Sequence, residues 1–571
     1  MGAGWGYSLL RWPLLILVGL WIGFLTGFYA VIRFFVAFEE YALTWRGKRK
    51  GLRANLRLAE TYGEWVEAAQ RLDEHLKFTS WQKDPRFAFY DYRGVATLIQ
   101  HLKELKSQGK DEELAMVLQG CVKYNFAGTQ GPMLYSQMYY GTKDLVVEYI
   151  KELESSIGYL ARAKTISQET KEVSFHLFKR NLGEPALCLS GGATFSYRHF
   201  GVVKALLEQG LLPNIVAGTS GGGLVAALVC TRTNEELKDL LVPELSDKIT
   251  ACWEPFPFWV RRWYRTGARF DSVDWARRCC WFTRGSMTFR EAYERTGKIL
   301  NISTVPADPH SPAILCNYIT CPNAVIWSAL LASAAVPGIL NPVVLMTKTT
   351  SGDIRPFSFG SKWKDGSLRT DIPIQALNTY FNVNFTIVSQ VNPHIALFMY
   401  GPRGAVGRPV SHRKGKGWRG GFVGSALENM VKLEIRKWLK LVKDLNLLPR
   451  LMDQDWSNIW LQQFKGTVTL FPRMGLKDFW YILADPDREK LAAMITAGKR
   501  STFPKILFIK HYFEVYRSIE RASKTIGLVD RDSPRWVVKK KQTNARHYEY
   551  EYANGEELSP LTLPSEMDVD G

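Results

Sequence analysis

Apolar residues follow three different patterns along the chain, and each predicts a different kind of element. The first is a run without charge from Pro13 to Ile32, which stays apolar to Phe38 except for Arg33. The second repeats in alternating steps of three and four residues, and the third consists of short apolar runs bounded by turn residues. We therefore expect a long apolar helix, then amphipathic helices, and then an α/β domain.

The apolar run is long enough for a membrane anchor, because about 20 helical residues span the roughly 30 Å of a bilayer's hydrocarbon core. We assign residues 1–12 to a short tail and residues 13–38 to the anchor, since the run is too long for the apolar part of a cleaved signal peptide. Only Arg11 precedes the anchor, and basic residues follow it: Arg46, Lys48, Arg49, Lys50, Arg53 and Arg57. This asymmetry predicts that the body of the protein is cytosolic. Small residues on one helix face leave both a single span and a hairpin open: Gly19, Gly23 and Gly27.

The helical period dominates residues 39–180. Apolar stripes run from Leu58 to Leu72 and from Val146 to Leu160, with a shorter one from Leu114 to Cys121. Such stripes are ordinary core faces of amphipathic helices. We expect this region to be a helical module that carries no chemistry.

Short apolar runs alternate with helical patterns between residues 185 and 380 and just beyond. The runs that we interpret as strands are Leu187–Leu189, Ile215–Ala217, Ala313–Leu315 and Thr386–Val391. This alternation predicts a largely parallel sheet covered by helices on both faces. Ligands then bind at the carboxyl ends of the strands.

A glycine turn that can carry a nucleophile follows the second of these strands. It reads Gly218-Thr219-Ser220-Gly221-Gly222 and leads into an apolar helix. A G-x-S-x-G sequence between a strand and a helix is the form of a nucleophile elbow, which lifts the serine hydroxyl out of the backbone. Ser220 is therefore our candidate nucleophile, and the N-H groups at the helix start favour a developing oxyanion.

A second glycine turn lies upstream, at Gly191 and Gly192, between a strand and a helix. Backbone N-H groups of such a turn can bind an oxyanion, so we expect both glycines to act with Gly221. A nucleotide site is disfavoured because neither G-x-G-x-x-G nor G-x-x-x-x-G-K-[ST] is present. His199, on the following helix, either packs in the core or touches substrate.

These turns and two later motifs resemble the patatin-like phospholipase domain. The later motifs are Ser328–Gly338 and Lys364-Asp365-Gly366-Ser367, and the stretches Cys188–Phe195 and Val388–His394 resemble the fungal and plant triacylglycerol lipase branch. The resemblance covers roughly residues 40 to 500. It implies a three-layer α/β/α core, and a dyad in which Ser220 is the nucleophile and Asp365 is the base. Ser190 stands where the family's oxyanion turn begins with an acid, so the second oxyanion donor stays open.

Other residues compete for the roles in this dyad. Asp371 is a second carboxylate, but it precedes Ile372-Pro373 and is expected to cap a helix. A Ser-His-Asp triad is the alternative mechanism, with histidines downstream of Ser220: His310, His394, His412, His511 and His547. An aspartate can serve as base for a serine only if burial raises its pKa.

The charge of the chain indicates an anionic partner. The 571 residues carry a formal net charge of +19 and 13% aromatic residues. Phospholipid and nucleic acid both fit this charge, and the apolar anchor favours phospholipid. Residues 251–285 hold ten aromatics and seven arginines against three acids. This insert suits a lipid headgroup interface, with base stacking and a buried domain contact as alternatives.

We expect residues 381–530 to form a C-terminal extension that consists of helices and strands. It contains a basic glycine-rich loop at 401–420 and a basic amphipathic helix over Leu427–Leu447, which either lies on lipid or packs on its own domain. Residues 531–571 read as a disordered tail. The eight cysteines are scattered without a C-x-x-C pair, which indicates reduced thiols of a cytosolic domain. No metal site is readable, and no cofactor is expected.

We therefore expect a membrane-associated serine lipid hydrolase that releases fatty acids from acylglycerols. Triacylglycerol of lipid droplets is favoured by the resemblance alone, with the endoplasmic reticulum or lipid droplet as location. The alternatives are a phospholipase or lysophospholipase, an acyltransferase with the same dyad, and a catalytically silent droplet protein that tethers a partner. An H-x-x-x-x-D acyltransferase signature is absent.

Overall fold

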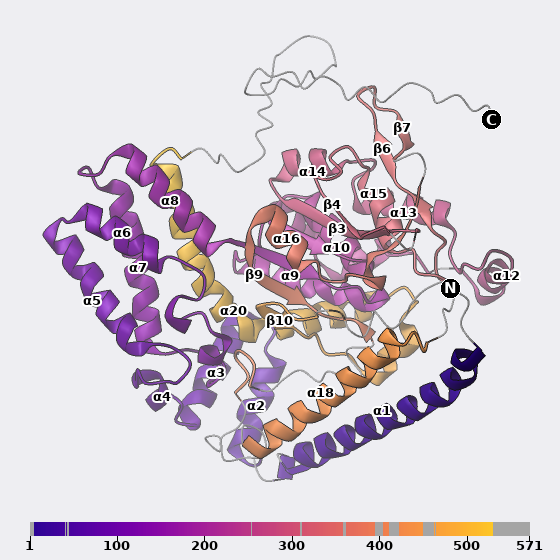
Figure 1. Cartoon of the computed structure of the whole chain (residues 1–571), viewed down its shortest axis with the longest axis horizontal. Helices are drawn as coiled ribbons and strands as arrows, with labels where there is room; N and C mark the ends of the chain where they lie inside the picture. Colours follow the sequence, from indigo (N-terminus) through magenta and orange to yellow (C-terminus); the bar gives the residue numbers. More distant parts are fainter. Residues whose placement is uncertain are drawn as a thin grey trace.

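The computed structural model describes residues 5–39, 41–42, 45–252, 254–308, 311–357, 361–393, 404–409, 422–448, 462 and 464–528. Several expectations lie outside these residues: the tail 531–571, most of the basic loop 401–420, and His310, His394, His412 and His547. Figure 1 shows a central sheet with helices around it, a helical module on one side, and a pair of long helices along the lower edge.

The central sheet is mostly parallel. Its parallel strands are β10 (Val468–Leu470), β9 (Val383–Ser389), β1 (Glu184–Leu189), β2 (Ile215–Gly218) and β3 (Ile299–Pro306), in that spatial order. Next to β3 lie the antiparallel strands β4 (Ile314–Cys316) and β8 (Lys362–Asp365), and β5 (Val343–Val344) pairs with β8. A separate hairpin consists of β6 (Met346–Lys348) and β7 (Ile354–Pro356). The expected α/β class is confirmed.

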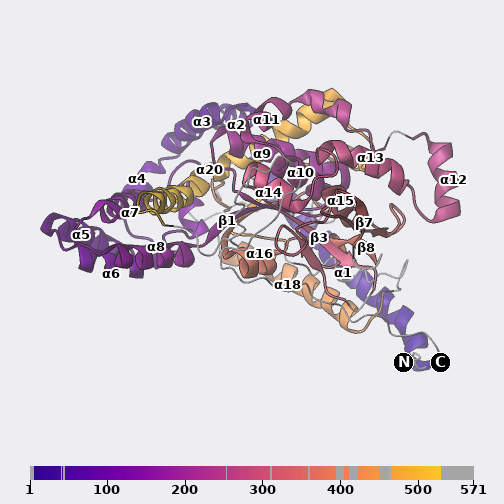
Figure 2. The same ribbon diagram turned by 90° about the horizontal axis from the view of Figure 1, so that it is seen from above.

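Helices cover both faces of the sheet, so the core has three layers (Figure 2). α9 (Arg198–Glu208), α10 (Gly221–Cys230) and α20 (Arg488–Thr525) cover one face, and α16 (Ile374–Phe381) covers the other. Side chains of β1 alternate between the layers: Leu187 and Leu189 enter the first core, and Ala186 and Cys188 enter the second. Further helices around the sheet are α11 (Asn234–Leu240), α14 (Phe289–Thr296) and α15 (Ile326–Ser333).

The helical module precedes the sheet. It consists of α2 (Lys48–Leu58), α3 (Tyr62–His75), α4 (Thr79–Lys83), α5 (Tyr92–Gln108), α6 (Asp111–Cys121), α7 (Asp144–Arg162) and α8 (Gln168–Leu182). The expected single helix from Leu58 to Leu72 is wrong. α2 ends at Leu58, and the Thr61 side chain accepts the Glu64 N-H to begin α3. α20 joins the module to the sheet because it packs on both α7 and α9.

The apolar segment forms one continuous helix, α1 (Trp5–Glu39), and does not bend into a hairpin. Among the described residues it is the one helix long and apolar enough to cross a membrane, judged by length and composition over Leu9–Phe35. The basic helix α18 (Phe422–Asp444) runs antiparallel beside it (Figure 1). Val442 packs near Val18, and Val431 packs near Leu25 and Tyr29. The apolar stripe of α18 therefore contacts α1.

Candidate active site

Ser220 lies in a sharp turn between β2 and α10. Its φ of 52° and ψ of −126° are strained for a residue with a side chain. A Cβ at Gly218 would lie 2.7 Å from the Gly223 Cα, and one at Gly222 would lie 2.8 Å from the Leu189 carbonyl carbon. Only glycine fits these two positions, so the local sequence forces the serine into the geometry of a nucleophile elbow.

Asp365 ends β8 and is fully buried. Its Oδ1 accepts the Ser367 N-H at 2.7 Å. Burial raises the pKa of Asp365 to about 7, although contacts from Ser367 and from the Ser220 side chain lower it. Oδ2 is buried and makes no hydrogen bond to any described residue, so this oxygen is available to accept a proton.

The upstream turn differs in part from the expectation. The Gly191 N-H donates to Asp371 Oδ1 at 2.9 Å, so it does not face an oxyanion, and we remove Gly191 from the expected donors. The N-H groups of Gly192, Ala193 and Gly221 make no hydrogen bond within the described part of the chain. Ala193, with a φ of 49°, stands next in the turn and was missed because it is not glycine. Three N-H groups thus remain for an oxyanion.

Asp371 does not cap a helix, so that expectation is wrong. The residue before α16 is Pro373, and the buried carboxylate of Asp371 instead binds the Gly191 N-H and the Asn392 side chain, the latter at 2.6 Å. The Thr219 hydroxyl donates to the Asp371 carbonyl oxygen at 2.7 Å. Asp371 therefore ties both glycine turns together. Burial raises its pKa to about 6, against the hydrogen bonds from Gly191 and Asn392.

The described histidines lie away from this arrangement. His199 is buried between Ser389 Oγ at 2.8 Å and the Ser190 carbonyl oxygen at 3.0 Å. Burial lowers the pKa of His199 to about 4, so it is a neutral packing residue. His511 contacts Tyr135 Oη at 2.8 Å in the core, on α20. None of the described histidines lines the cavity beside Ser220.

That cavity has a volume of about 340 Å³. Ser220, Asp365, Gly191, Gly192 and Gly221 all line it. Much of its wall is apolar: Leu224, Ile249, Phe270, Trp275, Phe282, Leu330, Val336, Ile339, Leu368, Phe464, Ile482 and Leu483. An apolar cavity with a few converging polar groups is the usual form of a small-molecule site, and this one suits a hydrocarbon chain.

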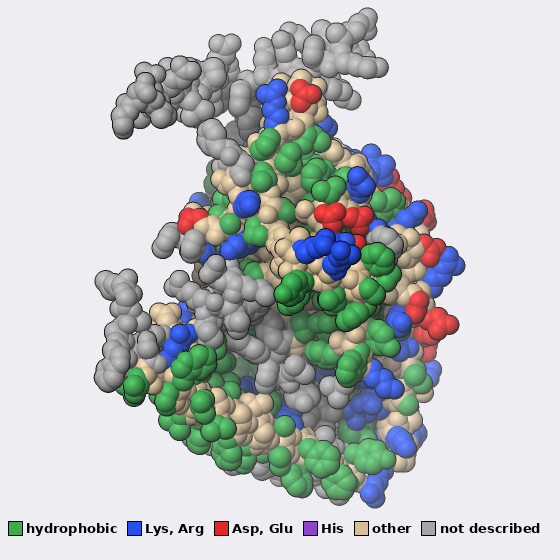
Figure 3. Space-filling view, turned by 90° about the vertical axis from the view of Figure 1, so that its right-hand side faces the viewer, with side chains coloured by type: hydrophobic (Ala, Val, Ile, Leu, Met, Phe, Trp, Pro, Cys, Tyr) green, Lys and Arg blue, Asp and Glu red, His purple; other side chains and the backbone are tan. Residues whose placement is uncertain are grey.

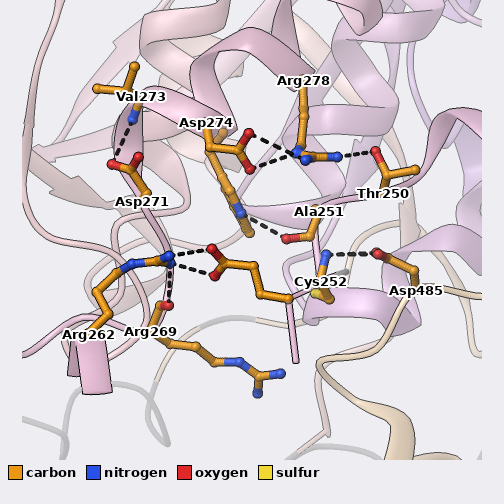
Figure 4. Close-up of polar contacts among 12 residues, drawn as sticks. Thr250, Ala251, Cys252, Arg262, Arg269, Asp271, Val273, Asp274, Arg278 and Asp485 are labelled. Atoms are coloured by element: carbon orange, nitrogen blue, oxygen red, sulfur yellow. Dashed lines mark hydrogen bonds and ion pairs between the residues drawn. The ribbon is translucent and has the colours of Figure 1, made fainter. Parts of the chain in front are cut away.

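Polar contacts fix the outer wall of the cavity (Figure 4). The Cys252 N-H donates to Asp485 at 2.9 Å, and Arg278 Nε donates to Asp274 at 2.8 Å. This wall comes from the insert 251–285, whose helices are α12 (Phe256–Thr266) and α13 (Ser272–Phe282). Part of the insert is therefore a domain contact, as one of the alternatives expected.

The fold and the site define an α/β protein with a serine elbow and a buried aspartate in one apolar cavity. Residues 187–378 match the family of patatin-like phospholipases, and residues 42–180 match a domain of unknown function (DUF3336). The chain belongs to the patatin-like phospholipase domain family, as the resemblance implied.

Similar proteins are patatin-like phospholipase domain-containing proteins of fungi. The chain is 62% identical to one of Yarrowia lipolytica over 91% of its own length and 63% of that protein. It is 58% identical to one of Meyerozyma guilliermondii over 90% of its length and 73% of that protein. It is 57% identical to one of Emericella nidulans over 90% of its length and 70% of that protein. The chain thus spans less than two thirds of the Yarrowia relative.

Proposed function

We propose that the protein is a serine acyl hydrolase that releases fatty acids from lipid esters. The observation that carries the proposal is that Ser220, Asp365 and three backbone N-H groups without a described hydrogen-bond partner all line one apolar cavity. Membership of the patatin-like phospholipase family supports lipid as the substrate class. The protein's own residues can supply each step.

The Ser220 hydroxyl oxygen attacks the ester carbonyl carbon while Asp365 Oδ2 takes the hydroxyl proton. The N-H groups of Gly192, Ala193 and Gly221 bind the oxyanion. The intermediate then expels the alcohol, which takes the proton from Asp365, and leaves an acyl-serine. Water, deprotonated by Asp365, attacks this ester, and Ser220 regains its proton as the fatty acid leaves.

The apolar wall favours acylglycerols, and we propose triacylglycerol, the neutral lipid of droplets, as the principal substrate. Glycerophospholipid is the second candidate, because Lys248 lines the same cavity and can contact a phosphate. Both substrates are water-insoluble, so the enzyme needs a lipid surface.

We place that contact at α1, with the catalytic body in the cytosol on an endoplasmic reticulum or droplet surface. Large side chains on α1 are exposed: Leu17 at 64%, Leu20 at 69%, Phe24 at 60% and Phe34 at 67%. α18 lies beside α1, and its side chains Lys432, Arg436 and Lys440 are exposed. A spanning α1 would draw these charges into hydrocarbon, at about 2.5–3.5 kcal/mol each. We therefore propose that α1 lies in the lipid surface.

A tag on the N-terminus tests this arrangement in isolated membranes. If α1 lies in the surface, added protease removes the tag without detergent. A tag protected until detergent opens the vesicles would contradict the surface arrangement and support a single span.

The activity is tested with full-length protein on triacylglycerol emulsions, phospholipid vesicles and a soluble short-chain ester. We expect Ser220→Ala and Asp365→Asn to lower kcat/KM by at least about 10³-fold on every substrate that the wild type hydrolyses. Ser351→Ala, at an exposed position, is the matched control and should leave the rate unchanged. Equal turnover in wild type and Ser220→Ala would exclude the mechanism, and no turnover in either would support a silent tethering protein.

A further inference from the structure

α12 is an amphipathic helix that the rest of the protein does not cover. None of its 11 residues is buried. Phe256 is 69% exposed, Phe258 68% and Tyr264 87%. Soluble proteins rarely leave a group of large apolar side chains on one short helix in water without a partner. α12 therefore has the character of a contact surface.

The inner side of α12 is fixed to the protein. The Arg269 guanidinium lies 4.6 Å from the centre of the Trp259 ring. Arg262 donates to Glu254 Oε2 at 2.6 Å and to the Arg269 carbonyl oxygen at 3.1 Å (Figure 4). These contacts hold the helix in one orientation, so its outer side presents Tyr264 and the neighbouring exposed residues to solvent.

The outer side of α12 is basic as well as apolar. Arg261 and Arg265 are exposed, and neither forms an ion pair with a described residue. The acids of the insert bind other groups than Arg261 and Arg265: Glu254 binds Arg262, Asp274 binds Arg278, and Asp271 accepts the Val273 N-H. The insert is thus left with uncompensated arginines beside exposed aromatic rings. Figure 3 looks at the side of the molecule on which α12 lies, and it shows basic and hydrophobic side chains together near the middle, with acidic side chains next to them.

The position of α12 links this surface to the cavity. The helix lies at the edge of the molecule in both ribbon views (Figures 1 and 2). Cys252 precedes it and Phe270 follows it, and both line the cavity. Trp480, which is 88% exposed, stands just before the lining residues Ile482 and Leu483. A surface held against α12 would therefore meet the wall of the cavity.

We propose that the outer face of α12 docks on a lipid surface that carries anionic phospholipid headgroups. Arg261 and Arg265 contact the phosphates, while Phe258 and Tyr264, on the same side of the helix, enter the headgroup layer. This docking is separate from the anchoring by α1, and it orients the cavity toward the lipid. The proposal rests on the proposed function only for the identity of the substrate that enters from that surface.

The test compares two surfaces, because α1 would hold the protein on either one. Full-length protein is floated with vesicles of phosphatidylcholine alone and with vesicles containing 20% phosphatidylserine, and hydrolysis is measured on triolein emulsions coated with the same mixtures. The variants are Arg261→Glu/Arg265→Glu and Phe258→Ser/Tyr264→Ser. The matched control is Arg86→Glu/Phe89→Ser, a pair of exposed residues on the helical module.

We expect wild type to prefer the anionic surface, and the charge-reversed variant to lose this preference by about tenfold. The aromatic variant should bind both surfaces several-fold more weakly, and the control should match wild type. Hydrolysis of a soluble short-chain ester should stay within twofold throughout. Flotation reports docking even if the protein proves inactive, which separates this proposal from the proposed function.

Several results would overturn docking at α12. These are a wild type without anionic preference, a charge-reversed variant that keeps it, or a control that loses as much as the variants. The same variants weakening the binding of a single-stranded oligonucleotide, with vesicle binding unchanged, would indicate nucleic acid and also overturn the proposal.

Discussion

The backbone N-H of Ser220 donates to the Ser333 hydroxyl oxygen at 2.9 Å. The same hydroxyl donates to the Ser303 carbonyl oxygen at 2.8 Å, so Ser333 links the strained elbow to β3. Strained backbone persists only where its surroundings hold it in place. Ser333 is thus a positioning residue for the candidate nucleophile.

Replacing Ser333 by alanine tests this role. The change leaves the Ser220 N-H without its partner, so we expect kcat on a soluble ester to fall by about 10- to 100-fold and the free energy of unfolding to fall by about 1–3 kcal/mol. Ser328→Ala is a matched control, because Ser328 is equally buried on α15 and accepts the Met346 N-H at 2.9 Å. It should cost similar stability with kcat unchanged. Equal losses of kcat in both variants would contradict a specific role for Ser333.

The raised pKa of Asp365 predicts an acid limb in the pH profile. Asp365 must be ionised to take the Ser220 proton, and its pKa is about 7. We therefore expect kcat/KM on a soluble ester to be constant above about pH 8 and to fall roughly tenfold per pH unit below pH 6. A profile that is flat from pH 5 to 8 would contradict Asp365 as the base.

Asp371 should move this limb, because its negative charge raises the pKa of Asp365. In Asp371→Asn the charge is removed while a side-chain oxygen remains to accept the Gly191 N-H. We expect the limb to shift to lower pH, since the ionised form of Asp365 becomes easier to form. Asp485→Asn is the control and should leave the limb in place, because Asp485 is a carboxylate whose pKa burial also raises but which binds the Cys252 N-H instead of the glycine turn. A limb that stays or moves upward in Asp371→Asn would refute the coupling.

The sequence was sufficient for the parts of the site that depend on local chemistry. β1, β2 and β9 are bounded apolar runs, and the two glycine turns are recognised because they directly follow β1 and β2. β3, the strand beside β2, was missed because Asn301, Ser303 and Thr304 interrupt its apolar pattern. These residues are nevertheless buried, and Asn301 Oδ1 accepts a hydrogen bond from Asn317 at 3.1 Å.

Contacts between distant segments could not be predicted. Ser333 is 113 residues from Ser220, and Asp371 is 180 residues from Gly191. Their side chains satisfy backbone groups that become neighbours only when the sheet forms, and no local period encodes this. The same reason explains the wrong prediction for Asp371. Its position close before a proline favours a helix cap, but in the folded protein its carboxylate binds the buried N-H of Gly191.

Burial of Asp365 should cost stability above neutral pH. Its pKa rises from 3.8 to about 7 on folding, so the folded state binds more protons than the unfolded state between these values, and stability falls as pH rises through them. Asp365→Asn removes this cost and keeps an oxygen for the Ser367 N-H. We expect the variant to unfold at a Tm about 2–5 °C above wild type at pH 8, with the difference shrinking toward pH 4. Thermal unfolding at both pH values checks this, and a lower Tm at pH 8 would contradict it.

The crossing of α9 and α20 gives a prediction that depends on packing alone. A Cβ at Gly201 would clash with the Ile495 carbonyl oxygen and lie 2.9 Å from the Gly498 Cα. Because backbone cannot yield as a side chain can, Gly201→Ala must separate the two helices, and we expect it to lower the free energy of unfolding by more than about 3 kcal/mol. Gly158→Ala is the control, since Gly158 lies in α7 and its Cβ would meet only the Arg162 side chain, at 3.7 Å. It should be neutral or stabilise by up to about 1 kcal/mol. Denaturant unfolding of both variants decides the point, and a Gly201→Ala protein as stable as Gly158→Ala would show that the helices do not cross in contact at this position.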